Sequence, residues 1–245
     1  MSSSAYFEAA KAALDRLEER SAEAIEQAAA ILVDAIRGGR AVYSFGCSHS
    51  FMLTEEVVYR TGGLVLINPV IPHGMSMDVR PLWMTSRIER VSGYGAVLAE
   101  GAGIAEGDAV LVASTSGRNP VAIDFALKSR ELGAKVIGIT AVDYSDAVTS
   151  RHPEGLKLKE AADLVIDNAA PEGDAVVNVE GFEQAVGPLS TLTGVVVVNA
   201  IVCQVVKLLV DAGETPPVFL SSNLDRGDAH NREVLERNRH RINYL

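Results

Sequence analysis

Short apolar runs alternate with amphipathic segments through the middle of the chain. The runs are rich in β-branched residues and predict five strands, at 41–45, 64–67, 109–114, 135–140 and 163–167. Continuous apolar runs of this length are typical of strands that helices cover on both faces. Because strands and helices alternate, and crossovers between parallel strands are right-handed, we expect an α/β fold with a five-stranded, mostly parallel sheet flanked by helices.

Both ends of the chain predict helices outside this alternation. Residues 4–37 place small and apolar side chains on one helical face and end at Gly38-Gly39. Two interpretations are open for this long stripe: it packs on a second subunit, or it lies on its own sheet. Residues 231–241 predict a charged C-terminal helix. We therefore expect one structural domain, with a helical extension over 1–40, an α/β unit over 41–215 and a tail over 216–245.

Charge and hydropathy limit the partners and the compartment that we expect for the protein. The net charge of -10 argues against a nucleic-acid or anionic-membrane partner, because both need a basic face. Residues 192–210 are apolar enough to raise the question of a membrane span, but Asn199, Gln204 and Lys207 favour a helix buried against the sheet. Charged side chains interrupt the N-terminal segment, so we predict no signal peptide, and two cysteines form no disulfide framework. We expect a soluble cytoplasmic protein.

Two loops of glycine and hydroxyl residues follow the first and third predicted strands and precede helices. They are Gly46-Cys47-Ser48-His49-Ser50 and Ser114-Thr115-Ser116-Gly117. The free backbone N–H groups and the positive dipole end of a helix start favour an anion, and hydroxyls add donors. Both loops lie at the carboxyl edge of the sheet, where ligands bind in such folds. They predict a phosphate site, and the alternative is that these residues only cap helices.

The same loops resemble those of a known family. The stretches 45–50 and 114–120, with Gly187-Pro188-Leu189-Ser190 as a further helix start, are similar to the phosphosugar-binding loops of the sugar isomerase (SIS) domain family. That family includes phosphoheptose isomerase and N-acetylmuramic acid 6-phosphate etherase, and the greatest resemblance is to uncharacterised bacterial members. It implies a three-layer SIS domain over 41–215 and a phosphosugar ligand. We expect the phosphate to be held by Ser48, Ser50, Ser114, Thr115, Ser116, Asn119 and Ser190, together with backbone N–H groups of the loops.

Candidate acids lie on the helix after the first loop. Moving a proton between adjacent carbons of a sugar needs a carboxylate or histidine base, and Glu55 and Glu56 are near the start of that helix. Since adjacent residues face about 100° apart, at most one faces the cleft. The catalytic glutamate of the resembled enzymes falls at Arg60, so Glu56, one turn earlier, is the leading candidate for the base. Arg60 is a candidate for binding a second anionic group.

Histidines are the candidates for opening the sugar ring. His49 lies in the first loop, and His73 and His230 are further candidates. His230 belongs to the tail, for which the resemblance suggests a lid over an active site of its own or a neighbouring subunit; the alternative is a solvated helix. No third ligand at metal spacing accompanies these residues, and no dinucleotide or Walker motif is present. We therefore predict neither metal nor cofactor.

Three functions are compatible with this pattern. The leading one is a sugar-phosphate isomerase in which Glu56 or Glu55 is the base and His49 or His230 assists. The second is a lyase or etherase that acts on an amino-sugar phosphate, and the third is a phosphosugar sensor without catalysis. The resemblance and the long N-terminal stripe further predict a homodimer or homotetramer.

Overall fold

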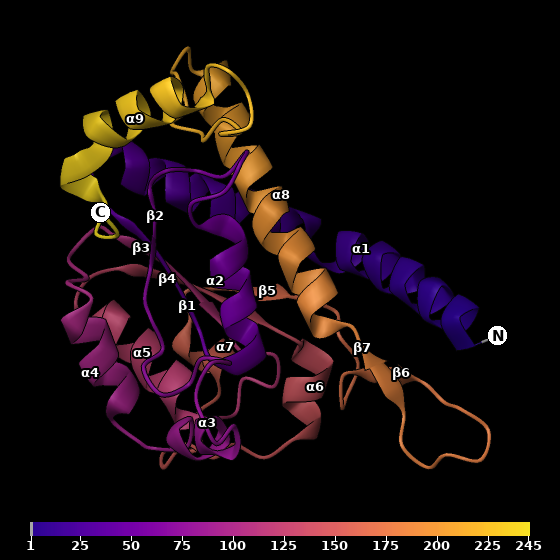
Figure 1. The fold of residues 1–245 in the computed structure, drawn as a ribbon. Helices are drawn as coiled ribbons and strands as arrows, with labels where there is room; N and C mark the ends of the chain where they lie inside the picture. The colour runs from indigo at the N-terminus through magenta and orange to yellow at the C-terminus, as the bar shows by residue number, and fades with distance from the viewer. Residues whose placement is uncertain (1) are drawn as a thin grey trace.

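A computed structural model describes residues 2–245 and shows a parallel sheet between two layers of helices (Figure 1). The sheet has the strand order β2-β1-β3-β4-β5, and all four pairings are parallel. Its strands are β2 (Ile67–Pro69), β1 (Val42–Gly46), β3 (Ala109–Ala113), β4 (Lys135–Thr140) and β5 (Leu164–Asp167). The predicted five-stranded α/β fold is confirmed.

The helices follow the predicted alternation. They are α1 (Ser2–Arg37), α2 (Phe51–Val57), α3 (Trp83–Ile88), α4 (Tyr94–Gly101), α5 (Pro120–Glu131), α6 (Val142–Ala147), α7 (Leu158–Ala161), α8 (Ser190–Asp211) and α9 (Gly227–Asn238), with 3-10 turns at Ser48–Ser50 and Arg239–Arg241. Along β3, Leu111 points into the core shared with α1 and α8, whereas Val110 and Val112 point into the core shared with α4 and α5. The alternation of side chains along a strand thus divides one apolar run between two cores.

The second predicted strand is displaced along the chain. The apolar run 64–67 predicted it, but β2 covers Ile67–Pro69 and Leu64 pairs instead with Val218 in an isolated antiparallel bridge. The backbone N–H of Val65 also donates to Pro217, at 2.9 Å. The backbone of Leu64 and Val65 therefore pairs with the tail rather than with β1, and an apolar pattern does not reveal this. A short antiparallel sheet of β6 (Ala175–Val177) and β7 (Val186–Pro188) was not predicted either.

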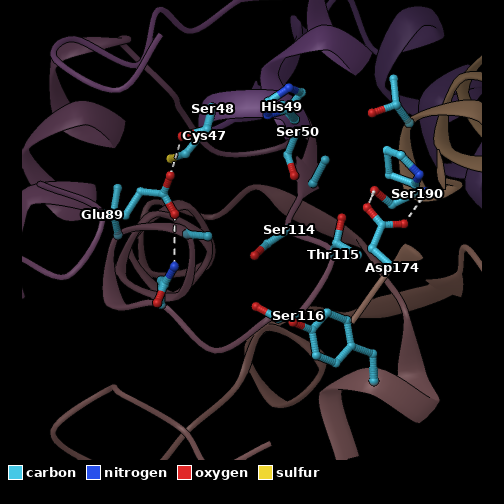
Figure 2. Close-up of a pocket in the computed structure, with 17 residues that line it drawn as sticks. Cys47, Ser48, His49, Ser50, Glu89, Ser114, Thr115, Ser116, Asp174 and Ser190 are labelled. Atoms are coloured by element: carbon cyan, nitrogen blue, oxygen red, sulfur yellow. Dashed lines mark hydrogen bonds between the residues drawn. The ribbon is translucent and has the colours of Figure 1, made fainter. Parts of the chain in front are cut away.

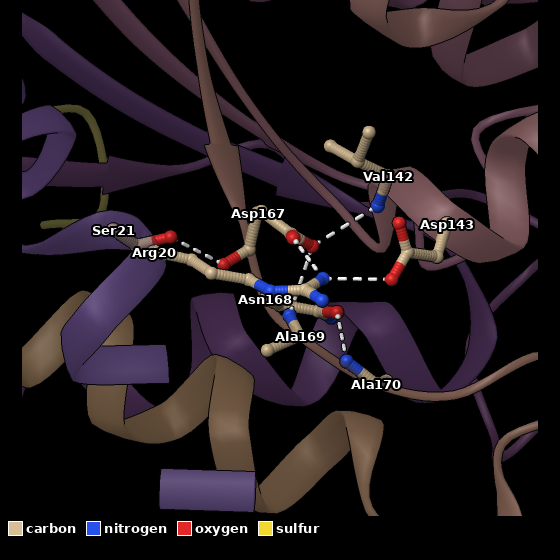
Figure 3. Close-up of polar contacts among 8 residues, drawn as sticks. All are labelled: Arg20, Ser21, Val142, Asp143, Asp167, Asn168, Ala169 and Ala170. Atoms are coloured by element: carbon tan, nitrogen blue, oxygen red, sulfur yellow. Dashed lines mark hydrogen bonds and ion pairs between the residues drawn. The ribbon is translucent and has the colours of Figure 1, made fainter. Parts of the chain in front are cut away.

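The long helix α1 is anchored to its own sheet. Arg20 pairs with Asp143 at 2.7 Å and with Asp167 at 3.2 Å, and Ser21 donates to the Asp167 carbonyl at 2.6 Å (Figure 3). Further along the helix, Leu32 is buried in the core with the strands and α8. The second half of α1 therefore lies on its own sheet, while the N-terminal half projects beyond it (Figure 1).

Helix α8 is a long apolar helix. Among residues 2–245 it is the one helix long and apolar enough to cross a membrane, with a mean hydropathy of 2.1. It packs between α1 and α2, and Val197, Val198 and Ile201 lie in the core. These contacts are those of a core helix rather than of a membrane span.

Candidate functional site

A cavity of about 370 Å³ opens at the carboxyl ends of β1 and β3. Both predicted loops line it, together with the start of α8 and the residue that follows α3 (Figure 2). The lining residues are Cys47, Ser48, His49, Ser50, Glu89, Ala113, Ser114, Thr115, Ser116, Asn119, Val121, Ala122, Tyr144, Asp174, Pro188, Ser190 and Thr191. The structure thus brings together all the loop residues that the sequence predicted for a phosphate.

The first loop has a backbone that tolerates little change. A Cβ at Gly46 would lie 2.4 Å from the carbonyl oxygen of Ser50, so the chain can turn this tightly only at glycine. Ser48 has φ of +51°, in the left-handed region that non-glycine residues seldom occupy. Its N–H donates to the Met75 carbonyl at 2.7 Å, which holds it there. Such strained residues cluster at functional sites.

Five hydroxyl groups of the cavity are free to bind a ligand. Within residues 2–245, the side chains of Ser50, Ser114, Thr115, Ser116 and Thr191 make no hydrogen bond, and neither do the backbone N–H groups of Thr115 and Ser116. Ser50 and Asn119 are the N-cap residues of α2 and α5, yet neither side chain caps its helix. The capping alternative is therefore wrong for these two residues.

The start of α8 is already occupied by a carboxylate. Asp174 accepts hydrogen bonds from the N–H groups of Leu189 at 2.9 Å and Ser190 at 2.7 Å, and from the Ser190 hydroxyl at 2.7 Å. Ser190 lines the cavity as predicted, but its hydroxyl proton is committed to Asp174. The negative charge at this helix start leaves the two strand loops as the better place for a phosphate.

Glu89 is the residue that the sequence analysis missed. It follows α3, and its carboxylate accepts from the Ser48 hydroxyl at 2.5 Å and from the Asn119 amide at 2.9 Å. It therefore joins both phosphate loops, and in Figure 2 it lies across the cavity from Asp174. Its distance along the chain from the two loops follows no motif. Its position at the break between two helical segments is therefore the one feature of the sequence that could have indicated a role in the site.

The thiol of Cys47 is unsuited to act as a nucleophile. Burial raises its pKa well above the usual value, and the charge of Glu89 raises it further. The thiol is therefore protonated at neutral pH, and only a thiolate is an effective nucleophile. Cys47 contributes to the wall of the cavity rather than to its chemistry.

Five predicted residues do not line this cavity: Glu55, Glu56, Arg60, His73 and His230. Glu56 accepts from Asn199 of α8 at 2.8 Å and pairs with Arg60, and Glu55 is exposed on α2. His230 lies in α9, where its ring contacts the Val218 carbonyl at 3.0 Å. The sequence predicted that at most one glutamate of α2 faces the cleft. Neither lines this cavity, because Glu56 is turned toward Asn199 of α8 and Glu55 is exposed. The structure also places α9 away from the cavity of its own chain (Figure 1).

Comparisons with known proteins agree with the fold and the loops. A family model of the SIS domain matches residues 5–141. The chain belongs to the SIS-domain family. Over 240 residues it is 42% identical to a UPF0309 protein of Shouchella clausii, and the alignment covers 98% of each chain.

Solved structures of SIS proteins share the architecture. A phosphoheptose isomerase from Neisseria gonorrhoeae superimposes with a TM-score of 0.56 at 14% identity, over 83% of this chain and 96% of that one. A phosphoheptose isomerase from Francisella tularensis gives a TM-score of 0.51 at 17% identity, over 82% and 94%. At this level of identity the likeness concerns the fold.

Proposed function

We propose that this SIS-domain protein binds a sugar phosphate in the cavity and isomerises it between aldose and ketose. The observation that supports this most strongly is the set of unengaged hydroxyl and N–H groups of both loops next to a carboxylate. Ser50, Ser114, Thr115 and Ser116 supply donors to the phosphate, whose binding orients the sugar. The chain has a net charge of -10, so local donors must supply the attraction for this anion.

Glu89 is our candidate for the base, in place of Glu56. Of the two carboxylates that line the cavity, Asp174 is held by three hydrogen bonds at the start of α8. Glu89 accepts one hydrogen bond on each oxygen, which leaves a lone pair for a proton of the substrate. It removes a proton from the hydroxyl-bearing carbon beside the carbonyl and returns it to the carbonyl carbon, while the hydroxyl proton passes to the carbonyl oxygen. Its hydrogen bonds to both loops link the position of the base to the bound phosphate.

His49 is our candidate for opening the sugar ring. It lines the cavity, and within the described chain its ring makes no hydrogen bond. A free imidazole can donate to or accept from the ring oxygen and the anomeric hydroxyl. His230 belongs to a different part of the fold and has no place in this cavity.

Thermal unfolding with a panel of sugar phosphates tests the proposal. We expect at least one phosphorylated sugar to raise the melting temperature, since a ligand at 100 times its Kd stabilises by about 2.7 kcal/mol. The same sugar without phosphate serves as the matched control and should give no shift. Incubation followed by NMR then identifies the product. Loss of a substituent instead of isomerisation would indicate the lyase, and binding without turnover would indicate the sensor.

A further inference from the structure

Three arginines gather directly behind the wall formed by Asn119 and Glu89. Arg118 and Arg90 are the chain neighbours of these two residues, and the Arg151 guanidinium donates to the Asn119 side-chain oxygen at 2.9 Å. A backbone hydrogen bond holds two of the arginines together: the Arg151 N–H donates to the Arg118 carbonyl at 2.9 Å. The chain as a whole is strongly acidic, so this concentration of positive charge is local.

No carboxylate within residues 2–245 forms an ion pair with any of the three arginines. The charge of Glu89 acts on Arg151, but its carboxylate is hydrogen-bonded to Ser48 and Asn119 instead. The Nε of Arg118 is buried without a hydrogen-bond partner among the described residues. Burial lowers the pKa of Arg151, and the positive charges of Arg118 and Arg90 lower it further. A buried donor without a partner, such as the Arg118 Nε, and neighbouring like charges are costly unless an anion compensates them.

The loop that carries Arg151 is held in place by a buried pair. His152 contacts Asp124 of α5 at 3.0 Å, and the side chains of both are largely buried. Asp124 also accepts from the N–H of Gly93 at 2.7 Å, and the His152 ring accepts from the N–H of Glu154 at 3.2 Å. Arg151 is therefore presented from a fixed loop rather than from a mobile one, which favours a binding role for its guanidinium.

We propose that Arg90, Arg118 and Arg151 bind a second anionic group of the ligand, a carboxylate or a second phosphate. This deepens the proposed function and rests on it: the loops hold one phosphate, the sugar lies along Glu89, and the second anion lies at the rim of the cavity. The three arginines do not line the cavity itself, but the Arg151 guanidinium contacts Asn119, which does. Guanidinium groups suit both anions, because they donate two parallel hydrogen bonds. The ligand class is thus a doubly anionic phosphosugar. The sequence analysis gave this task to Arg60, which is paired with Glu56 outside the cavity.

Isothermal titration with two matched pairs of probes tests the proposal. The pairs are glucose 6-phosphate with 6-phosphogluconate, which adds a carboxylate, and fructose 6-phosphate with fructose 1,6-bisphosphate, which adds a phosphate. We expect the doubly anionic member of at least one pair to bind about tenfold more tightly, as one charge-assisted hydrogen bond allows. The pair in which the doubly anionic sugar binds more tightly shows whether the arginines prefer a carboxylate or a phosphate.

Variants of the arginines test whether these residues cause the tighter binding of the doubly anionic sugar. Arg118→Gln with Arg151→Gln should abolish the preference, so that the doubly anionic sugar binds about as weakly as its singly phosphorylated partner. Arg118→Lys with Arg151→Lys should keep part of it, which controls for misfolding. Arg232→Gln, an exposed charge on α9, should keep all of it. Equal affinity within both pairs, or a preference that survives Arg118→Gln with Arg151→Gln, overturns the inference alone. Absence of binding by all four sugars overturns it together with the proposed function.

Discussion

Ser48 donates a hydrogen bond from its hydroxyl to the carboxylate of Glu89, 41 residues further along the chain. The contact joins the first phosphate loop to the residue after α3, and Asn119 makes the equivalent contact from the second loop at 2.9 Å. A phosphate that draws the two loops together would therefore also fix the carboxylate. Because of these two contacts, we propose that phosphate binding and proton transfer are coupled.

Replacing Glu89 tests the identity of the base. We expect Glu89→Gln to reduce turnover of an isomerised sugar phosphate by about 10²–10⁴-fold, the range typical of a general base. Its affinity for the sugar phosphate should change little, because glutamine keeps the size and one acceptor oxygen. Steady-state kinetics and titration on the same preparation separate these two effects.

Glu56→Gln is the matched comparison. Because Glu56 pairs with Arg60 and Asn199 rather than facing the cavity, we expect this variant to keep most of the activity. If Glu56→Gln loses turnover and Glu89→Gln retains it, the assignment from sequence holds and ours is wrong.

Removing the free hydroxyl groups of the second loop should weaken the binding of a sugar phosphate. Ser114→Ala combined with Ser116→Ala removes two donors to a charged group, each worth about 1.5–3 kcal/mol, so the Kd for a sugar phosphate should rise about 100-fold or more. Ser86→Ala, an exposed serine on α3, is the control and should bind like the parent protein. An unchanged Kd for the double variant would show that the phosphate lies elsewhere.

The raised pKa of Cys47 predicts a pH-dependent reactivity. In a Cys203→Ser background, alkylation of Cys47 should be very slow at neutral pH and rise only well above pH 9, because the thiolate is the reactive form and burial disfavours it. Mass spectrometry of the alkylated chain at a series of pH values measures this. Rapid labelling at pH 7 would contradict the burial and charge that we describe.

An apolar groove predicts self-association. Leu14 and Ile25 of α1 face Val196 and Ala200 of α8 across a groove of about 590 Å³. Its rim carries acidic side chains on α1 and Lys207 on α8, so it is complementary in charge to a second copy of itself. We propose that two copies associate through this groove and that the protein sediments as a dimer at micromolar concentration.

A charge in the groove tests that dimer. Val196→Glu should give monomers, whereas Val210→Glu, an exposed valine at the end of the same helix and outside the groove, should not. Sedimentation velocity distinguishes the species. A monomeric parent protein would refute the association.

Much of the fold could be predicted because its signals are local. The runs at β1, β3 and β4 are continuous and apolar, and the two phosphate loops combine glycine with hydroxyls beside a helix start. What could not be predicted depends on contacts between distant segments. The tail affects where β2 begins, since Val218 and Pro217 pair with the backbone of Leu64 and Val65. Glu89 enters the cavity only because α3 ends beside the first loop.

The orientation of α2 was the other feature beyond the reach of the sequence. Glu55 and Glu56 are adjacent near a helix start, where a catalytic carboxylate can lie. Helical periodicity alone could not exclude either glutamate as the base. The packing of α2 on α8 turns Glu56 toward Asn199 and leaves Glu55 exposed. The choice between them depended on a neighbouring helix 143 residues away in the chain.

The most direct test of the central claim is solvent deuterium exchange into a bound sugar phosphate, followed by NMR, with the parent protein and with Glu89→Gln. We predict deuterium at the carbon beside the carbonyl, together with the aldose–ketose partner, for the parent protein, and neither for Glu89→Gln. Sugar phosphates that bind but never exchange would contradict the isomerase. Exchange at the same rate in Glu89→Gln would contradict its role as the base.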